Sequence, residues 1–131
     1  MKVLVVDDMT SMRHIMLHML KSLGYKDNDE AVNGRQALKL LRENKYDLLI
    51  TDYHMPKING IQLLKLIRTD KDLSHLPVLM VTCEDQKNEI ESIIAAKVNG
   101  FIIKPFTTKT LRKQIDWIEK ESNEGLSINI A

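Results

Sequence analysis

The sequence has few of the residues that mark several large classes of protein. It contains a single cysteine, Cys83, which excludes an internal disulfide and fits a reducing compartment. Its formal net charge is +1, with 19 basic and 18 acidic residues, which argues against nucleic-acid binding through bulk charge. The apolar run Val3–Val6 ends at Asp7 and is too short for a signal peptide or a membrane span. These absences predict a soluble, cytoplasmic protein that binds neither nucleic acid nor a membrane.

The length and composition predict one compact domain. A chain of 131 residues leaves no room for a second domain of typical size. Hydrophobic residues make up 44% of it, enough to bury a core and too many for a disordered chain. Helical periodicity is lost from Ser122 to Ala131. We therefore expect a domain over residues 1–121 and a flexible tail over residues 122–131.

Short apolar runs alternate with helical patterns along the chain. The continuity of four runs is typical of strands buried on both faces of a parallel sheet, and a fifth run is weaker. In chain order the runs are Val3–Val6, the weaker Glu30–Val32, Leu48–Thr51, Val78–Val81 and Phe101–Ile103. Apolar residues at helical spacing follow each run, as in the stripe from Met12 to Leu23. Five strand–helix units in this order predict an α/β fold with a parallel sheet and helices on both faces.

Polar side chains follow four of the predicted strands at the points where the strands end. Asp7 and Asp8 follow the first run, Asp52 the third, Thr82 the fourth and Lys104 the fifth. Ligands bind beyond the carboxyl ends of the strands in open α/β sheets. We therefore expect three carboxylates, a hydroxyl and an ammonium group to converge at one edge of the sheet.

Three carboxylates at one edge need a partner of opposite charge. Two unit charges about 4 Å apart repel by about 4 kcal/mol at an effective dielectric constant of about 20. A hard divalent cation removes this repulsion at neutral pH, and oxygen ligands without thiols favour Mg²⁺ or Mn²⁺. Mg²⁺ commonly keeps water ligands that a phosphate can replace. The cluster therefore predicts magnesium-dependent phosphoryl transfer.

Each residue of the cluster has a predicted role in that chemistry. Asp52 is the predicted nucleophile, because it stands alone at a central strand end and a carboxylate can form an aspartyl phosphate. Asp7 and Asp8 are predicted to hold the metal. Lys104 would neutralise charge on the transferring group, and the Thr82 hydroxyl would contact a phosphate oxygen.

Four segments of the chain together form a specific pattern. They are VLVVDD at Val3–Asp8, TDYHMPKINGIQLL at Thr51–Leu64, LPVLMVT at Leu76–Thr82 and GFIIKPF at Gly100–Phe106. This pattern resembles the response-regulator receiver domain, and within that family the CheY type of chemotaxis regulator. The resemblance extends from Lys2 to about Lys120. It implies a flavodoxin-like (βα)5 fold, with a five-stranded parallel sheet in the order 2-1-3-4-5. It also implies a cis peptide bond between Lys104 and Pro105.

The resemblance further implies how the site works. A histidine kinase of the CheA type would phosphorylate Asp52, and Mg²⁺ would bind Asp8 and Asp52 directly. Asp7 would contact the metal mainly through water and His54 through its backbone carbonyl. Thr82 would then move towards the phosphoryl group and the side chain of Phe101 would turn inwards.

The same resemblance implies a switch without catalysis of an external reaction. The face formed by the fourth helix, fifth strand and fifth helix would bind an output protein, with a flagellar motor switch as one candidate. We expect a monomer that takes part in chemotaxis or motility signalling and turns over no external substrate.

Some residues depart from the family pattern and leave alternatives open. Phe101 stands where CheY has tyrosine, so the inward state lacks a hydroxyl hydrogen bond. Cys83, His54 and Glu84 flank the site, where side chains tune how fast the phosphoryl group is lost. The chain could also be the receiver part of a longer regulator or a phosphate sink. A haloacid-dehalogenase-type phosphatase is disfavoured because His54 occupies the place of its second aspartate.

Overall fold

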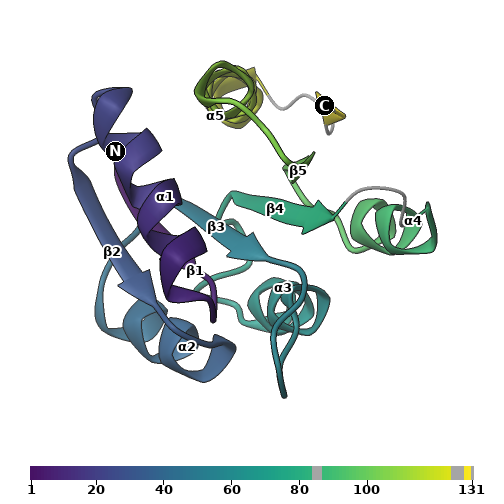
Figure 1. Ribbon diagram of the computed structural model, residues 1–131. Helices are drawn as coiled ribbons and strands as arrows, with labels where there is room; N and C mark the ends of the chain where they lie inside the picture. Colours follow the sequence, from purple (N-terminus) through teal and green to yellow (C-terminus); the bar gives the residue numbers. More distant parts are fainter. Residues whose placement is uncertain (84–86, 125–128, 131) are drawn as a thin grey trace.

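A computed structural model describes residues 1–83, 87–124 and 129–130 of the chain. Strands and helices alternate from the N-terminus to the C-terminus (Figure 1). The elements are β1 (Lys2–Val6), α1 (Thr10–Ser22), β2 (Asp27–Ala31), α2 (Gly34–Glu43), β3 (Leu48–Asp52), α3 (Gly60–Thr69), β4 (Val78–Cys83), α4 (Lys87–Ala95), β5 (Gly100–Lys104), α5 (Thr108–Glu124) and β6 (Asn129–Ile130). Glu84, which the sequence placed beside the site, lies outside the described residues.

The strands form one sheet in the order β2-β1-β3-β4-β5-β6, and every neighbouring pair is parallel. The first five strands have the predicted order 2-1-3-4-5, which confirms the flavodoxin-like fold. The order reverses at β1, which pairs with both β2 and β3. A ligand site is expected at such a reversal point, beyond the carboxyl ends of the strands.

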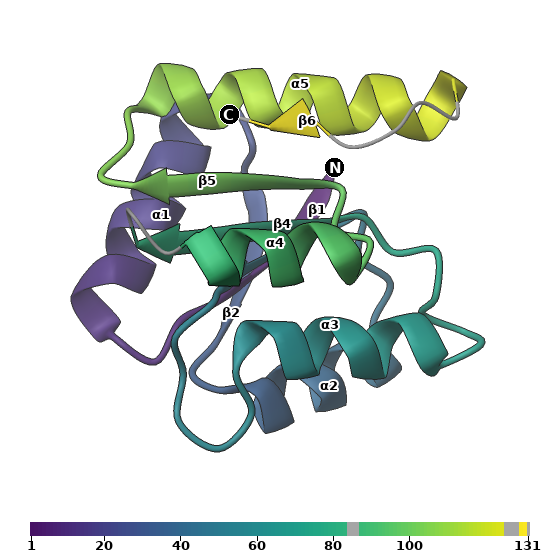
Figure 2. The same ribbon diagram turned by 90° about the vertical axis from the view of Figure 1, so that its right-hand side faces the viewer.

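Helices cover both faces of the sheet, as Figures 1 and 2 show. Residues of α1 and α5, among them Leu20 and Ile115, pack on one face. Residues of α2, α3 and α4, among them Leu41, Leu64 and Ile93, pack on the other face. The central strands between these two layers bury mainly apolar residues, which explains their continuous hydrophobic runs. None of the helices within the described part of the chain combines the length and hydrophobicity needed to cross a membrane.

Strand β2 is the strand whose predicted boundaries differ most from those in the structure. The apolar run predicted a strand at Glu30–Val32, whereas β2 spans Asp27–Ala31 and has the polar sequence DNDEA. It lies at the edge of the sheet and pairs only with β1, so that Val5 is opposite Glu30. An edge strand can be held by backbone pairing while its side chains stay polar, and hydrophobicity is then a poor guide to its position.

The C-terminal segment contains secondary structure that the sequence did not predict. Helix α5 continues through Ser122 to Glu124, and Asn129–Ile130 form a short strand that pairs with Gly100 and Phe101 of β5. These elements extend beyond the domain end expected at residue 121, and the flexibility of residues 122–131 stays a prediction. The sequence from Ser122 to Glu124 is polar and has no apolar stripe, so periodicity did not predict this last turn.

Helix α3 begins directly behind the end of β3. Asn59 caps it, since its side chain accepts a hydrogen bond from the Gln62 amide while the Gln62 side chain accepts one from the Asn59 amide. A Cβ atom on the next residue, Gly60, would lie 2.6 Å from the Asp52 carbonyl oxygen and 2.6 Å from the Met80 sulfur. Only glycine allows this close approach, so Gly60 fixes the helix against the strand that carries Asp52.

Candidate functional site

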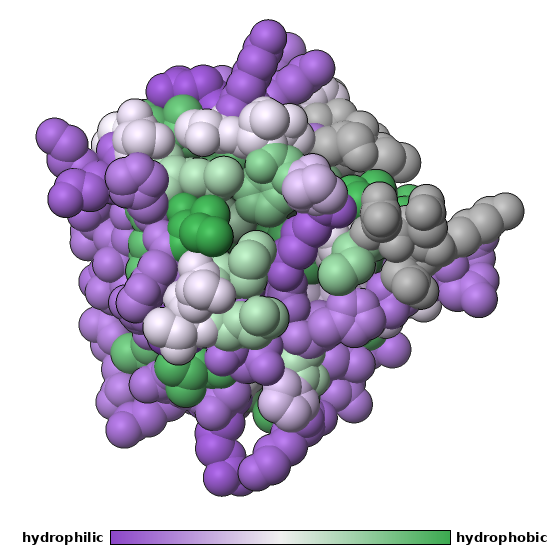
Figure 3. Space-filling model, viewed as in Figure 1, coloured by the Kyte–Doolittle hydropathy of each residue, from purple (hydrophilic) through white to green (hydrophobic). Residues whose placement is uncertain are grey.

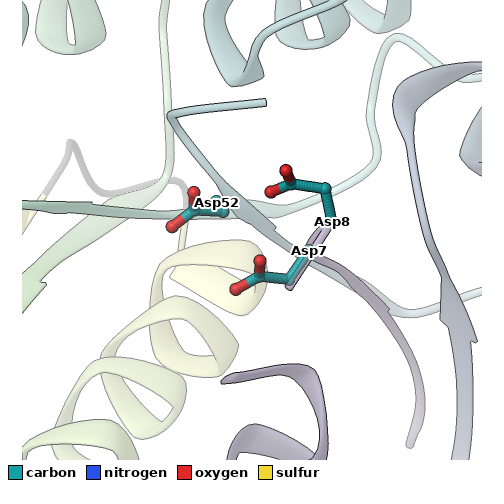
Figure 4. Close-up of side chains that lie close together, drawn as sticks. All are labelled: Asp7, Asp8 and Asp52. Atoms are coloured by element: carbon teal, nitrogen blue, oxygen red, sulfur yellow. The ribbon is translucent and has the colours of Figure 1, made fainter. Parts of the chain in front are cut away.

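Three carboxylates meet at the carboxyl ends of β1 and β3, as Figure 4 shows. Asp7 and Asp8 directly follow β1, and Asp52 is the last residue of β3. One oxygen from each residue lies within 4.8 Å of the other two. Asp7 and Asp52 are each only 7% exposed, while Asp8 is exposed to solvent. The structure therefore brings together the three acidic residues that the sequence singled out.

Lys104 supplies the positive charge nearest to Asp52. It is the last residue of β5, and its Nζ atom lies 2.6 Å from Asp52 Oδ1 and 4.0 Å from Asp7 Oδ2. Burial by itself lowers the pKa of Lys104, but the hydrogen bond and charge of Asp52 outweigh it and the pKa is raised. The lysine therefore stays charged at neutral pH and can hold an anionic group beside Asp52. The peptide bond that follows it, to Pro105, is cis, as predicted.

Burial raises the pKa of both inner carboxyls. For Asp52, burial is the largest cause and exceeds the opposing hydrogen bond and charge of Lys104. For Asp7, burial again leads, and the charge of Asp52 adds to it, although the Met9 amide donates a hydrogen bond that lowers the pKa. A raised carboxyl pKa means that the ionised form is costly in the folded state. One lysine does not remove that cost.

The donor set of the cluster suits a hard divalent cation. The three ligand atoms are all carboxylate oxygens, and two of them belong to carboxyls whose ionised form is destabilised by burial. Oxygen donors with high negative charge are what Mg²⁺ and Mn²⁺ prefer. The cluster therefore fits the divalent cation, Mg²⁺ or Mn²⁺, that the sequence predicted for Asp7, Asp8 and Asp52.

Thr82 lies on β4 beside the strand that ends in Asp52, and Phe101 lies near the start of β5. Thr82 is fully buried near the end of β4, and its hydroxyl donates a hydrogen bond to Glu89 Oε2 at 3.3 Å. Phe101 is 1% exposed and belongs to the core on the α3 and α4 side of the sheet. The ring is thus already in the inward position without a phosphoryl group, and the movement of Thr82 stays a prediction.

His54 lies in the connection after β3, and its ring points to helix α4. Its Nε2 atom is 3.1 Å from Glu89 Oε1, and the ring tilts against that of Tyr53, with centroids 4.9 Å apart. The role of its backbone carbonyl as a metal ligand stays a prediction. Nothing in the sequence pointed to Glu89, because the position of its side chain depends on how α4 is placed against β4 and β3.

Arg13 is a second residue that the sequence analysis did not assign to the site. It is 6% exposed in α1, and its Nη1 donates to the Asp7 backbone carbonyl at 2.9 Å. Its Nε donates to Glu30 Oε1 at 2.6 Å. A charged residue three positions before Met16, on the buried stripe of α1, was the available signal. Arg13 ties the loop that carries Asp7 and Asp8 to α1 and β2.

A cavity of about 240 Å³ opens beside the cluster. It lies between α1 and the β5–α5 connection, and its walls are mostly apolar, with Met12, Met16 and Phe106 among them. Figure 3 shows hydrophobic residues gathered in the middle of the face that carries α1, with polar residues around them. A larger hollow of about 1100 Å³, lined in part by Tyr46 and His75, shares no residue with the acidic cluster.

Known proteins share both the sequence and the fold. A family model described as the response regulator receiver domain matches residues 3–116. The chain is 46% identical over 118 residues to Chemotaxis protein CheY-3 of Vibrio cholerae serotype O1, covering 90% of this chain and 91% of the relative. It is 43% identical over 123 residues to Chemotaxis protein CheY of Pseudomonas aeruginosa, covering 94% and 99%.

A solved structure, the chemotaxis response regulator CheY4 of Vibrio cholerae, superposes with a TM-score of 0.81 at 32% identity. The match covers 89% of this chain and 97% of that one. These relatives and the family model point to the same kind of protein as the strand order and the acidic cluster at the strand ends. The chain belongs to the response regulator receiver domain family and is CheY-like.

Proposed function

We propose that this protein accepts a phosphoryl group on Asp52 from a histidine kinase of the CheA type and then changes its affinity for an output protein. The observation that carries the proposal is the contact of Lys104 Nζ with Asp52 Oδ1, 2.6 Å apart, inside a cluster of three carboxylates. The CheY relatives support a role in chemotaxis or motility, with a flagellar motor switch as one candidate output.

Asp52 acts as the nucleophile in the proposed transfer. A carboxylate oxygen of Asp52 forms a bond to phosphorus as the bond between phosphorus and the kinase's histidine nitrogen breaks, and the electron pair goes to that nitrogen. The Lys104 ammonium moves its hydrogen bond from the carboxylate to a phosphoryl oxygen. Asp52 is 7% exposed at the end of its strand, which limits attack by water on the product.

Asp7, Asp8 and Asp52 hold Mg²⁺ in this proposal, and the His54 backbone carbonyl completes the protein ligands. Mn²⁺ fits the same oxygen donors. When bound, the metal supplies charge neutralisation for the transferring phosphoryl group. Asp7 and Asp8 are adjacent in the chain and reach the cluster from β1, so they stay in place while Asp52 changes its charge.

Thr82 and Phe101 connect the site to the output face. The Thr82 hydroxyl is the donor at the end of β4 that a phosphoryl oxygen on Asp52 would recruit, and Phe101 lies one strand further, on β5. The output protein binds the face of α4, β5 and α5. Phosphorylation thus acts on α4 and β5 through Thr82, as a shift between two states of that face.

The proposal also covers the oligomeric state, the domain bounds and the location of the protein. We propose a monomeric receiver domain over residues 1–121 that works in the cytoplasm and turns over no external substrate. The receiver part of a longer regulator and a phosphate sink are the alternatives that share this chemistry. The dehalogenase-type phosphatase loses its support, because the family match is to receiver domains.

Beryllofluoride, a mimic of the phosphoryl group, provides the test. We expect Mg²⁺ and beryllofluoride together to shift the NMR signals of Thr82 and Lys104 in the wild type. Asp52→Asn should abolish these shifts, whereas Asp116→Asn, an exposed acidic residue on α5, should keep them. Equal shifts in wild type and Asp52→Asn would refute Asp52 as the phosphoacceptor.

A further inference from the structure

Glu89 is the one residue of α4 whose side chain reaches both Thr82 and His54 among the described residues. It lies in the first turn of the helix, and its side chain is only 20% exposed. Its Oε2 accepts the Thr82 hydroxyl hydrogen bond at 3.3 Å. Its Oε1 lies 3.1 Å and its Oε2 3.2 Å from His54 Nε2. One carboxylate therefore joins α4 to the ends of β4 and β3.

The contact with Glu89 occupies the Thr82 hydroxyl, which the phosphorylated site would use as a hydrogen-bond donor. The Thr82 hydroxyl has a single hydrogen to donate. While it donates to Glu89, it cannot donate to an oxygen on Asp52. Thr82 is fully buried, so its hydroxyl does not find a free partner in water instead. Glu89 and the phosphoryl group on Asp52 therefore compete for the same donor.

We infer that Glu89 is a positioning residue that holds α4 against the unphosphorylated site and is released when Thr82 turns to the phosphoryl group. The inference rests on the proposed function of Asp52 and names the link through which that site acts on the output face. Once the Thr82 hydrogen bond is lost, the His54 contact is the polar contact that Glu89 keeps among the described residues, beside the apolar packing of Ile90. Because the His54 side chain is about half exposed, that second contact is weak.

The charge on Glu89 gives the release its direction. A dianionic phosphoryl group on Asp52 repels a nearby carboxylate, and the same group attracts the Thr82 hydroxyl. Both effects move Glu89 away from β4, and α4 is part of the face that binds the output protein. The link between Asp52 and α4 therefore needs no movement of the Phe101 ring, which is already buried.

A double-mutant cycle tests the inference. The Kd for beryllofluoride, titrated at saturating Mg²⁺ and followed by NMR, is measured for wild type, Glu89→Ala, Thr82→Ala and the double variant. Glu89→Ala should bind about two- to tenfold more tightly than wild type, because one hydrogen bond no longer has to be broken. In the Thr82→Ala background the same change should have a clearly smaller effect, because only the charge repulsion remains once the Thr82 hydroxyl is gone.

Two controls separate Glu89 from a general effect of charge or stability. Glu91→Ala removes the same charge from an exposed position of α4 and should leave the Kd unchanged. Glu89→Gln keeps an acceptor for Thr82 and should bind beryllofluoride more nearly like wild type than Glu89→Ala does. If Glu89 had a purely structural role, Glu89→Ala would change the melting temperature, but it would not bind beryllofluoride more tightly than Glu89→Gln and Glu91→Ala.

The outcomes also separate this inference from the proposed function. If wild type binds beryllofluoride and the Kd values of Glu89→Ala and Glu91→Ala agree, the positioning role is wrong while Asp52 keeps its role. An equal effect of Glu89→Ala with and without Thr82 overturns it as well. If wild type does not bind beryllofluoride at all, the proposed function itself fails.

Discussion

Mg²⁺ should stabilise this protein by an amount that can be worked out from the acidic cluster. The oxygens of Asp7 and Asp52 lie within 4.8 Å of each other, and both residues are 7% exposed. At that separation and an effective dielectric constant of about 20, two ionised carboxylates repel by about 3.5 kcal/mol. Lys104 opposes this repulsion but does not remove the cost of burying both charges, since the pKa of each carboxyl is raised.

The expected gain follows from binding linkage. Free Mg²⁺ at a hundred times its Kd stabilises the folded state by about 2.7 kcal/mol. For a chain of 131 residues, the average entropy of unfolding converts this into a rise in melting temperature of about 10 °C. Asp52→Asn removes one ligand and should weaken Mg²⁺ at least about tenfold. At the same Mg²⁺ concentration its gain should fall to about 5 °C or less.

Differential scanning calorimetry with EDTA or Mg²⁺ measures both gains. The matched control is Asp116→Asn, which removes an exposed carboxylate of α5 and should keep the full rise. A melting temperature that Mg²⁺ leaves unchanged would show that the cluster holds no metal. Equal rises in Asp52→Asn and wild type would show that Mg²⁺ binds elsewhere.

Three further predictions concern Lys104, Gly60 and Asp7. In EDTA, Lys104→Ala should lose about 2–4 kcal/mol in urea unfolding, because it leaves buried carboxylates without their cation, and a loss below about 0.5 kcal/mol would contradict this. Gly60→Ala should lose about 1–3 kcal/mol in the same assay, because its Cβ would meet the Asp52 carbonyl oxygen at 2.6 Å, and an unchanged midpoint would refute the close approach. Because the pKa of Asp7 is higher in the folded state than in the unfolded state, the folded state binds the Asp7 proton more tightly. This proton binding stabilises the fold at low pH, and the stabilisation is lost as the pH rises through the folded-state pKa. In EDTA, the melting temperature of wild type minus that of Asp7→Asn should therefore fall as the pH rises from about 4, and a constant difference would contradict the sign.

The sequence was most informative where function depends on strand ends. Asp7, Asp52 and Lys104 each follow a buried apolar run, and parallel strands bring their carboxyl ends to one edge of the sheet. The spacing of three strand ends was therefore enough to predict a cluster that the structure contains. Chain order and apolar periodicity predicted a parallel sheet, and the resemblance to receiver domains supplied its strand order.

Features that depend on packing or on edge strands were missed. Strand β2 was displaced in the prediction, because an edge strand needs few apolar residues to pair with β1. Arg13 and Glu89 act through single side-chain contacts made by helices. Helical periodicity shows which face of a helix is buried, but it does not show which strand end that face meets.

The most direct test of the account is the intact mass of the protein after incubation with acetyl phosphate and Mg²⁺. The account predicts one added phosphoryl group on the wild type, no addition on Asp52→Asn, and loss of the reaction in EDTA. Beryllofluoride binding by NMR distinguishes a rapidly lost phosphoryl group from an inactive site. A phosphoryl group on Asp52→Asn, or a wild type that neither gains mass nor binds beryllofluoride, would contradict the assignment of Asp52 as the phosphoacceptor.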